Sequence, residues 1–263
     1  MIEGNVRFRS QLAGVDQTEK EDEVMMRNIR LQPTPPKAVI ISCSRSYASI
    51  NDIFDCPPSE LDSIRIMGNT CSSCDGVVGS VEFCFSMHEP PLLLVMGNTR
   101  NDVIEGAVRR EMMACGRKDA PRKAGVSEDV ELYRKVSAAA RDALSQMPEG
   151  SFDRLVSLAV ELNIWNTIET LVTSSGYLQK RVRDRKLTMM GVVFDVDSGK
   201  VRFLGTHPSM TALMQKSSRV DMIRTAASPR IPSEEALAQL VAGNRRYALG
   251  KGSFTNRKDE QQE

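Results

Sequence analysis

Three short apolar runs mark strands in the first hundred residues. They span residues 38–41, 64–67 and 92–96, and the first and third are each entered from a pair of prolines. Runs of this kind that do not alternate with polar residues are typical of strands buried on both faces. The sequence therefore predicts strands that lie in the interior of a sheet.

Helical spacing of apolar residues separates these strands. Val77, Val81 and Phe85 recur along 77–87 at the period of a helix. After Gly97, Asp102 is placed to cap a further helix. Strands that alternate with helices indicate parallel pairing, with helices covering a central sheet.

The second half of the chain predicts two helices and a strand pair. Residues 128–147 are rich in good helix formers, and an apolar stripe over 155–172 predicts a long helix. Residues 189–196 and 201–204 then read as two strands joined across a tight polar turn.

A segment near the start is echoed near the end. Residues 4–8 read Gly-Asn-Val-Arg-Phe, and residues 243–247 read Gly-Asn-Arg-Arg-Tyr. We interpret this as the trace of a tandem repeat: a domain over 1–206, a proline-containing linker over 207–232, and the opening helix of a second, truncated repeat over 233–263. One short match is weak evidence of a repeat, and coincidence between two helix ends is the alternative.

Composition narrows the class of protein. Hydrophobic residues make up 41% and charged residues 26%, and 35 basic residues against 34 acidic ones leave a net charge of +1. This balance gives no reason to expect nucleic acid or a membrane surface as a partner. The six scattered cysteines favour reduced thiols, so we expect a soluble intracellular protein, in the cytoplasm or an organelle. The compartment stays open, because a targeting segment upstream of this sequence would not be seen.

Two motifs stand at the ends of predicted strands: residues 36–44 run from Pro36 into Cys43-Ser44, and residues 65–69 read Arg-Ile-Met-Gly-Asn. They resemble motifs of the β-class carbonic anhydrases, in which the first strand ends in Cys-x-Asp-Ser-Arg and the second motif reads Arg-x-Ala-Gly-Asn. The likeness continues over roughly residues 2 to 205, through residues 79–83, 161–163, 171–175 and 191–199. It implies an α/β fold with a mostly parallel central sheet flanked by helices and an N-terminal helical arm.

The resemblance also implies a zinc site and a reaction. In this family two cysteines and one histidine hold zinc, with water or an aspartate as fourth ligand, and zinc-bound hydroxide attacks CO2 to give bicarbonate. An Asp and an Arg of Cys-x-Asp-x-Arg form a pair beside the metal. Here Cys43 is retained, but Arg45 stands at the Asp position and Tyr47 at the Arg position.

The remaining two ligand positions have changed. The family's Gly-His-x-x-Cys reads Gly-Asn-Thr-Arg-Asn here, so that Asn98 replaces the histidine and Asn101 the second cysteine. A neutral amide oxygen is a poor ligand for zinc. We therefore expect zinc to be absent or bound in a non-standard way. The domain would then be a catalytically degenerate unit with a structural or regulatory role, paired with an adjacent repeat as a pseudo-dimer or with a second copy as a homodimer.

Other cysteines and arginines leave alternatives open. Cys71 and Cys74 have the spacing of a metal-binding pair and could join Cys43, which would give either an active carbonic anhydrase with a changed ligand set or a non-catalytic thiol or metal-binding module. The alternative is that they are small buried residues and part of a flexible loop.

Three arginines, Arg45, Arg65 and Arg100, could converge on an anion such as bicarbonate, or could instead fill space and pair at the surface. Trp165 and Tyr177 are expected to lie in the core or at a subunit contact.

Overall fold

The computed structural model describes residues 35–46, 48–54, 60–72, 76–121 and 131–215. All of them belong to the first of two compact units, Met1–Met222, and the second unit, Ile223–Glu263, lies outside the described residues. Both copies of the repeated segment, residues 4–8 and 243–247, also lie outside the described residues. The tandem arrangement therefore stays a prediction.

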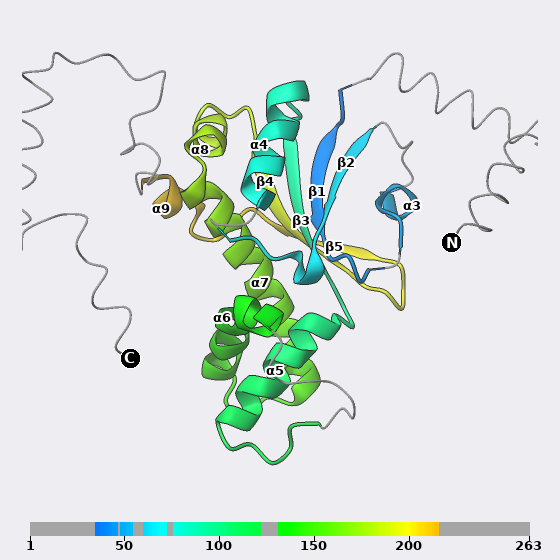
Figure 1. The fold of residues 1–263 in the computed structure, drawn as a ribbon, viewed down its shortest axis with the longest axis vertical. Helices are drawn as coiled ribbons and strands as arrows, with labels where there is room; N and C mark the ends of the chain where they lie inside the picture. Colours follow the sequence, from blue (N-terminus) through cyan, green and yellow to red (C-terminus); the bar gives the residue numbers. More distant parts are fainter. Residues whose placement is uncertain (1–34, 47, 55–59, 73–75, 122–130, 216–263) are drawn as a thin grey trace, which may run out of the picture. The chain divides into compact units, whose positions relative to one another are not determined.

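The described part of the chain is built on one five-stranded sheet in the order β2-β1-β3-β4-β5 (Figure 1). The first four strands in this order pair in parallel, and β5 pairs antiparallel with β4. This arrangement confirms the predicted α/β fold with a mostly parallel sheet. The strands are β1 Ala38–Ser42, β2 Leu61–Arg65, β3 Leu92–Asn98, β4 Thr188–Phe194 and β5 Val201–Gly205.

The second strand differs from its prediction. It spans Leu61–Arg65 instead of residues 64–67, and it is followed by a 3-10 turn, η1, over Met67–Asn69. Because β2 lies at the edge of the sheet, Ser63 and Arg65 are exposed and break the apolar run by which a buried strand is recognised.

The larger core lies on the face of the sheet covered by α4 and α7, and α5 and α6 pack against α7 beyond the ends of the strands (Figure 1). The helices are α3 Ile50–Phe54, α4 Gly76–His88, α5 Asp102–Ala114, α6 Glu131–Gln146, α7 Phe152–Ser174, α8 Gly176–Arg183 and α9 Met210–Gln215. Neighbouring strand residues alternate between two cores, so that Ile41 joins the larger one and Ile40 a smaller one with Ile50 of α3. Among the described helices none is long and apolar enough to cross a membrane.

The linker predicted over residues 207–232 contains a short helix, α9, in its first part. Leu213 of α9 is buried, and its carbonyl accepts a hydrogen bond of 3.4 Å from the Gln179 side chain of α8. The rest of that segment, from residue 216, lies outside the described residues.

Two glycines let α7 lie directly on the sheet. A Cβ atom at Gly97 of β3 would stand 2.7 Å from Cγ1 of Val160, and one at Gly191 of β4 would stand 2.7 Å from Cγ2 of Ile164. Both contacts are shorter than side-chain carbons tolerate, so a side chain at either position would push α7 away from the strands.

We predict that Gly97→Ala lowers the free energy of unfolding by about 1–3 kcal/mol, the usual cost of overpacking a core. Gly79→Ala is the matched control, because a Cβ at this exposed position of α4 meets no atom within 4 Å. Alanine inside a helix should stabilise the control by about 0.5–1 kcal/mol relative to glycine. Urea unfolding of both variants measures the difference, and equal effects would contradict the close packing of α7.

Candidate functional site

Cys43, the residue predicted to be a retained ligand, lies just after β1 at the carboxyl edge of the parallel strands and is fully buried. Its sulfur accepts hydrogen bonds from the backbone N–H groups of Gly68, at 3.2 Å, and Arg45, at 3.4 Å. Gly68 belongs to η1 and has a φ of 68°, a conformation that favours glycine. The turn after β2 is therefore held over the sulfur.

Asn98 and Asn101, which we expect at the positions of the other two ligands, are hydrogen-bonded to each other. Asn98 ends β3, Asn101 precedes α5, and both side chains are buried. The Nδ2 group of Asn101 donates to Oδ1 of Asn98 at 3.1 Å. The Nδ2 group of Asn98 donates in turn to the carbonyl of Thr99 at 2.8 Å.

The remaining amide oxygen of this pair caps a helix. Oδ1 of Asn101 accepts from the backbone N–H groups of Val103, at 3.1 Å, and Ile104, at 3.4 Å. The prediction that Asp102 caps this helix is therefore wrong by one residue: Asn101 is the N-cap and Asp102 is the first helical residue. Asp102 instead pairs with Arg45, with 2.9 Å between Oδ2 and Nη2.

The residues at the three family ligand positions do not fit a zinc ion. Zinc needs lone pairs from several ligands, preferably thiolate or imidazole, that point at one centre. Cys43 supplies one sulfur, whereas the amide oxygens of Asn98 and Asn101 accept hydrogen bonds within the protein. Among the described residues, no three His, Cys, Asp or Glu side chains gather closely enough to hold a metal.

The three candidate anion-binding arginines contact different acceptors. Arg45 pairs with Asp102, and Arg100 pairs with Asp197 at 2.9 Å between Nε and Oδ2. Arg65 donates from Nη2 to the backbone carbonyls of Ser44 and Ser46 in the loop after β1. Both ion pairs are largely solvent-exposed, and exposed pairs contribute little stability.

Two residues of α7 complete the site and were not singled out from the sequence. Asn163 donates from Nδ2 to the carbonyl of Gly68 at 2.8 Å, and Thr167 donates from Oγ1 to the carbonyl of Asn69 at 2.9 Å. Both side chains are buried. Their hydrogen bonds fix the turn whose Gly68 N–H contacts the Cys43 sulfur. The only sequence signal for them was Asn163 within the family-like segment 161–163.

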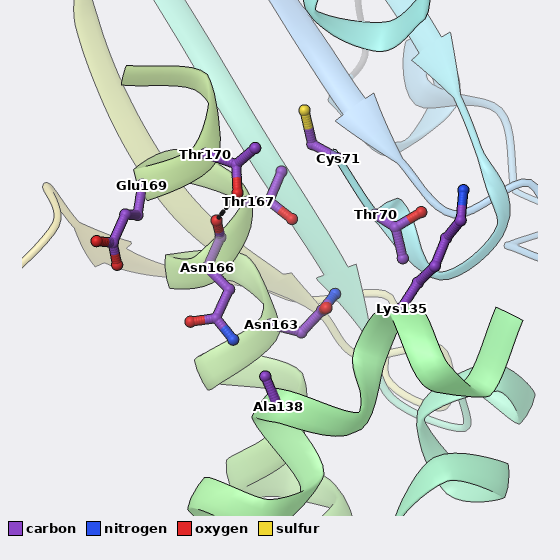
Figure 2. Close-up of a pocket in the computed structure, with 9 residues that line it drawn as sticks. All are labelled: Thr70, Cys71, Lys135, Ala138, Asn163, Asn166, Thr167, Glu169 and Thr170. Atoms are coloured by element: carbon purple, nitrogen blue, oxygen red, sulfur yellow. Dashed lines mark hydrogen bonds between the residues drawn. The ribbon is translucent and has the colours of Figure 1, made fainter. Parts of the chain in front are cut away.

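The remaining candidates lie elsewhere or outside the described residues. Cys71 lines a cavity next to α6 and α7 (Figure 2), whereas Tyr47 and Cys74 are not among the described residues.

The two aromatic residues singled out from the sequence contact other side chains or backbone groups. The ring of Trp165 packs edge-on against His207 at 5.5 Å between centroids, and the Tyr177 hydroxyl donates to the carbonyl of Phe85 at 3.1 Å. Burial lowers the pKa of His207, although the nearby Glu169 carboxylate acts in the opposite direction.

Comparison with known proteins assigns the family. Residues 38–201 match the carbonic anhydrase family. Carbonic anhydrase 2 of Mycobacterium tuberculosis is 27% identical over 167 residues, which are 63% of this chain and 72% of that protein.

Solved structures share the fold. The β-carbonic anhydrase CafA of Aspergillus fumigatus has a TM-score of 0.62 at 18% identity, over 81% of this chain and 96% of that chain. A tetrameric β-carbonic anhydrase of Sordaria macrospora has a TM-score of 0.60 at 16% identity, over 78% and 98% of the two chains. The chain belongs to the β-class carbonic anhydrases, the family whose reaction is the reversible hydration of CO2 to bicarbonate.

We predict that Asn101→Ala lowers the free energy of unfolding by about 2 kcal/mol or more, because it removes a helix cap and leaves a buried amide oxygen of Asn98 without its donor. Asn101→Ser is the matched control, since serine can still cap the helix and should cost less. Thermal or urea unfolding measures both variants. A loss below about 0.5 kcal/mol for Asn101→Ala, typical of surface substitutions, would contradict the structural role of this amide.

Proposed function

We propose that this domain is a carbonic anhydrase-family unit that binds no zinc at the family's metal position and does not hydrate CO2 by itself. The observation that carries the proposal is the buried hydrogen bond between Asn98 and Asn101, 3.1 Å long, at the two positions where the family has its histidine and second cysteine. Cys43 is the one family ligand that the chain retains.

Energetics favour the amide pair over a metal here. For both amide oxygens to turn toward zinc, the protein would lose the N-cap of α5, worth about 1 kcal/mol, and the hydrogen bond between the amides, worth about another 1 kcal/mol. The zinc ion would then be bound by two neutral amide oxygens and the Cys43 thiolate, whereas the family's zinc is bound by an imidazole and two thiolates. The one thiolate does not compensate for the weaker binding by the amide oxygens.

The role that remains is structural or regulatory, beside an adjacent repeat or a second copy of the chain. Assembly is supported by the relative from Sordaria macrospora, which is tetrameric. It is further supported by large apolar side chains on the surface of the described part, since Phe83 and Met87 of α4 are 65% and 58% exposed. A symmetric pair, or a pair of repeats within one chain, would cover such a surface.

We predict that the purified full chain contains far less than one zinc ion per chain and shows no CO2 hydration above background. Metal analysis by mass spectrometry and a stopped-flow hydration assay measure the two quantities. One zinc ion per chain together with turnover would contradict the proposal. If that zinc were then lost in Cys71→Ser or Cys74→Ser, it would identify the alternative ligand set of Cys43 with Cys71 or Cys74.

We predict that zinc binding returns when the family residues are restored by Asn98→His, Asn101→Cys, Arg45→Asp and Tyr47→Arg together. The new thiol would lie at the N-terminus of α5, where the helix dipole favours a thiolate. Asn98→His alone is the control, because two ligands of three should not hold stoichiometric zinc. If the fourfold variant folds and still binds no zinc, the alignment of the metal site is wrong.

A further inference from the structure

The helix α9 follows β5 and packs on α7 (Figure 1). Near its carboxyl end Leu213 is buried, and the carbonyl of Leu213 accepts a hydrogen bond from Gln179 of α8 at 3.4 Å. Just before its first residue, the ring of His207 lies edge-on against the ring of Trp165 of α7, with 5.5 Å between the centroids. His207 therefore joins the beginning of α9 to α7.

His207 also accepts two hydrogen bonds from the beginning of α9. Its Nδ1 atom accepts from the backbone N–H of Ser209 at 3.0 Å, and its carbonyl accepts from that of Met210 at 2.9 Å. A ring nitrogen that accepts a hydrogen bond carries no proton, so this imidazole is neutral with its proton on Nε2. A second proton would go to Nδ1. It would break the bond to Ser209 and place a positive charge at the N-terminal end of a helix, where cations are unfavourable.

The indole of Trp165 is held in place on its other side by the sheet. A Cβ atom at Gly191 of β4 would stand 2.9 Å from Cζ3 of this ring, and the indole packs against the larger core. Trp165 is the single tryptophan of the chain, and His207 is one of only two histidines. The indole is therefore a fixed reporter of the state of the imidazole.

The charged groups around His207 define the sign of its response to pH. Burial, the larger effect, lowers the pKa of His207, and the carboxylate of Glu169 on α7 acts in the opposite direction. Also on α7, Glu161 is paired with Arg202 of β5 at 2.6 Å. The helix α9 itself, with the sequence MTALMQ, carries no charge, and on α8 Arg183 donates to Gln179.

A lowered pKa means that the docked state binds the neutral imidazole better than the protonated one. The resulting stability of docking is complete above the ordinary histidine pKa of about 6.5 and is lost as the pH falls through the lower pKa of the docked state.

We propose that protonation of His207 loosens α9 from α7, so that α9 is docked at neutral pH and partly released in acid. The chain continues from α9 into residues 216–263. The device therefore acts at the junction between the described domain and the rest of the chain. It uses none of the residues at the family's ligand positions, so it is independent of the zinc content of the domain and of the function proposed above.

Two measurements on the full chain between about pH 5 and pH 8 test the proposal. Trp165 fluorescence reports the titration, because an imidazolium in contact with an indole quenches it. Fluorescence should fall in a single-proton transition with a midpoint below about 6.5. Amide hydrogen exchange of residues 207–215, divided by the intrinsic rate at each pH, should become about fivefold faster across the same transition, the factor expected for the loss of one hydrogen bond.

The variant His207→Asn should abolish both changes, because its amide oxygen can still accept from Ser209 but does not titrate. The matched control is His88→Asn at the end of α4, which changes the other histidine and should keep both. Glu169→Gln should move the midpoint to lower pH, whereas Asp153→Asn, about three turns before Trp165 on α7, should leave it unchanged.

Three results would overturn the proposal. The first is a fluorescence transition that is absent in the wild-type chain or persists in His207→Asn. The second is quenching without faster exchange of residues 207–215, since His207 would then titrate while α9 stays docked. The third is a midpoint above about 6.5, which would mean that protonation favours docking.

Discussion

The hydrogen bond between the side chains of Asn98 and Asn101 ties the end of β3 to the beginning of α5. In the zinc enzymes of this family the corresponding positions would be joined through the metal. In this chain one amide supplies both the link and the helix cap, because Asn101 donates to Asn98 and accepts from Val103 and Ile104. Asn101, which stands where we expect the family's second cysteine, thereby satisfies backbone groups of α5 that would otherwise need another partner. These hydrogen bonds link β3 to α5 at the carboxyl edge of the sheet.

A domain of this size does not need a metal link in order to fold. Zinc is essential where the core is too small to fold alone, but here α7 lies on β3 and β4 through Gly97 and Gly191 and buries a large apolar surface. From this base Asn163 and Thr167 hold the turn whose Gly68 N–H contacts the Cys43 sulfur. The family's fold is thus kept, and the proposed change in its chemistry requires only a few side chains. A fold retained in this way suits a unit whose task is to assemble or to regulate.

The sequence predicted the sheet better than the site. Strands β1 and β3 were recognisable because they are apolar throughout, whereas β2 was displaced by about three residues because exposed Ser63 and Arg65 interrupt its pattern. The motifs predicted Asn98 and Asn101 as replaced ligands, which stays a prediction, and the hydrogen bond between them depends on how β3 turns into α5. The partners of Arg45 and Arg100 are 57 and 97 residues away, and those of Asn163 and Thr167 are 95 and 98 residues away. Contacts over such separations have no local sequence signal.

The central claim is that hydrogen-bonded amides occupy the place of the metal ligands. A crystal structure of the full chain grown with excess zinc, with anomalous diffraction recorded at the zinc absorption edge, tests this claim most directly. The account predicts that the Asn98–Asn101 hydrogen bond is intact and that no anomalous peak lies within bonding distance of the Cys43 sulfur. A zinc peak about 2.3 Å from that sulfur, with Asn98 or Asn101 turned toward it, would contradict the account.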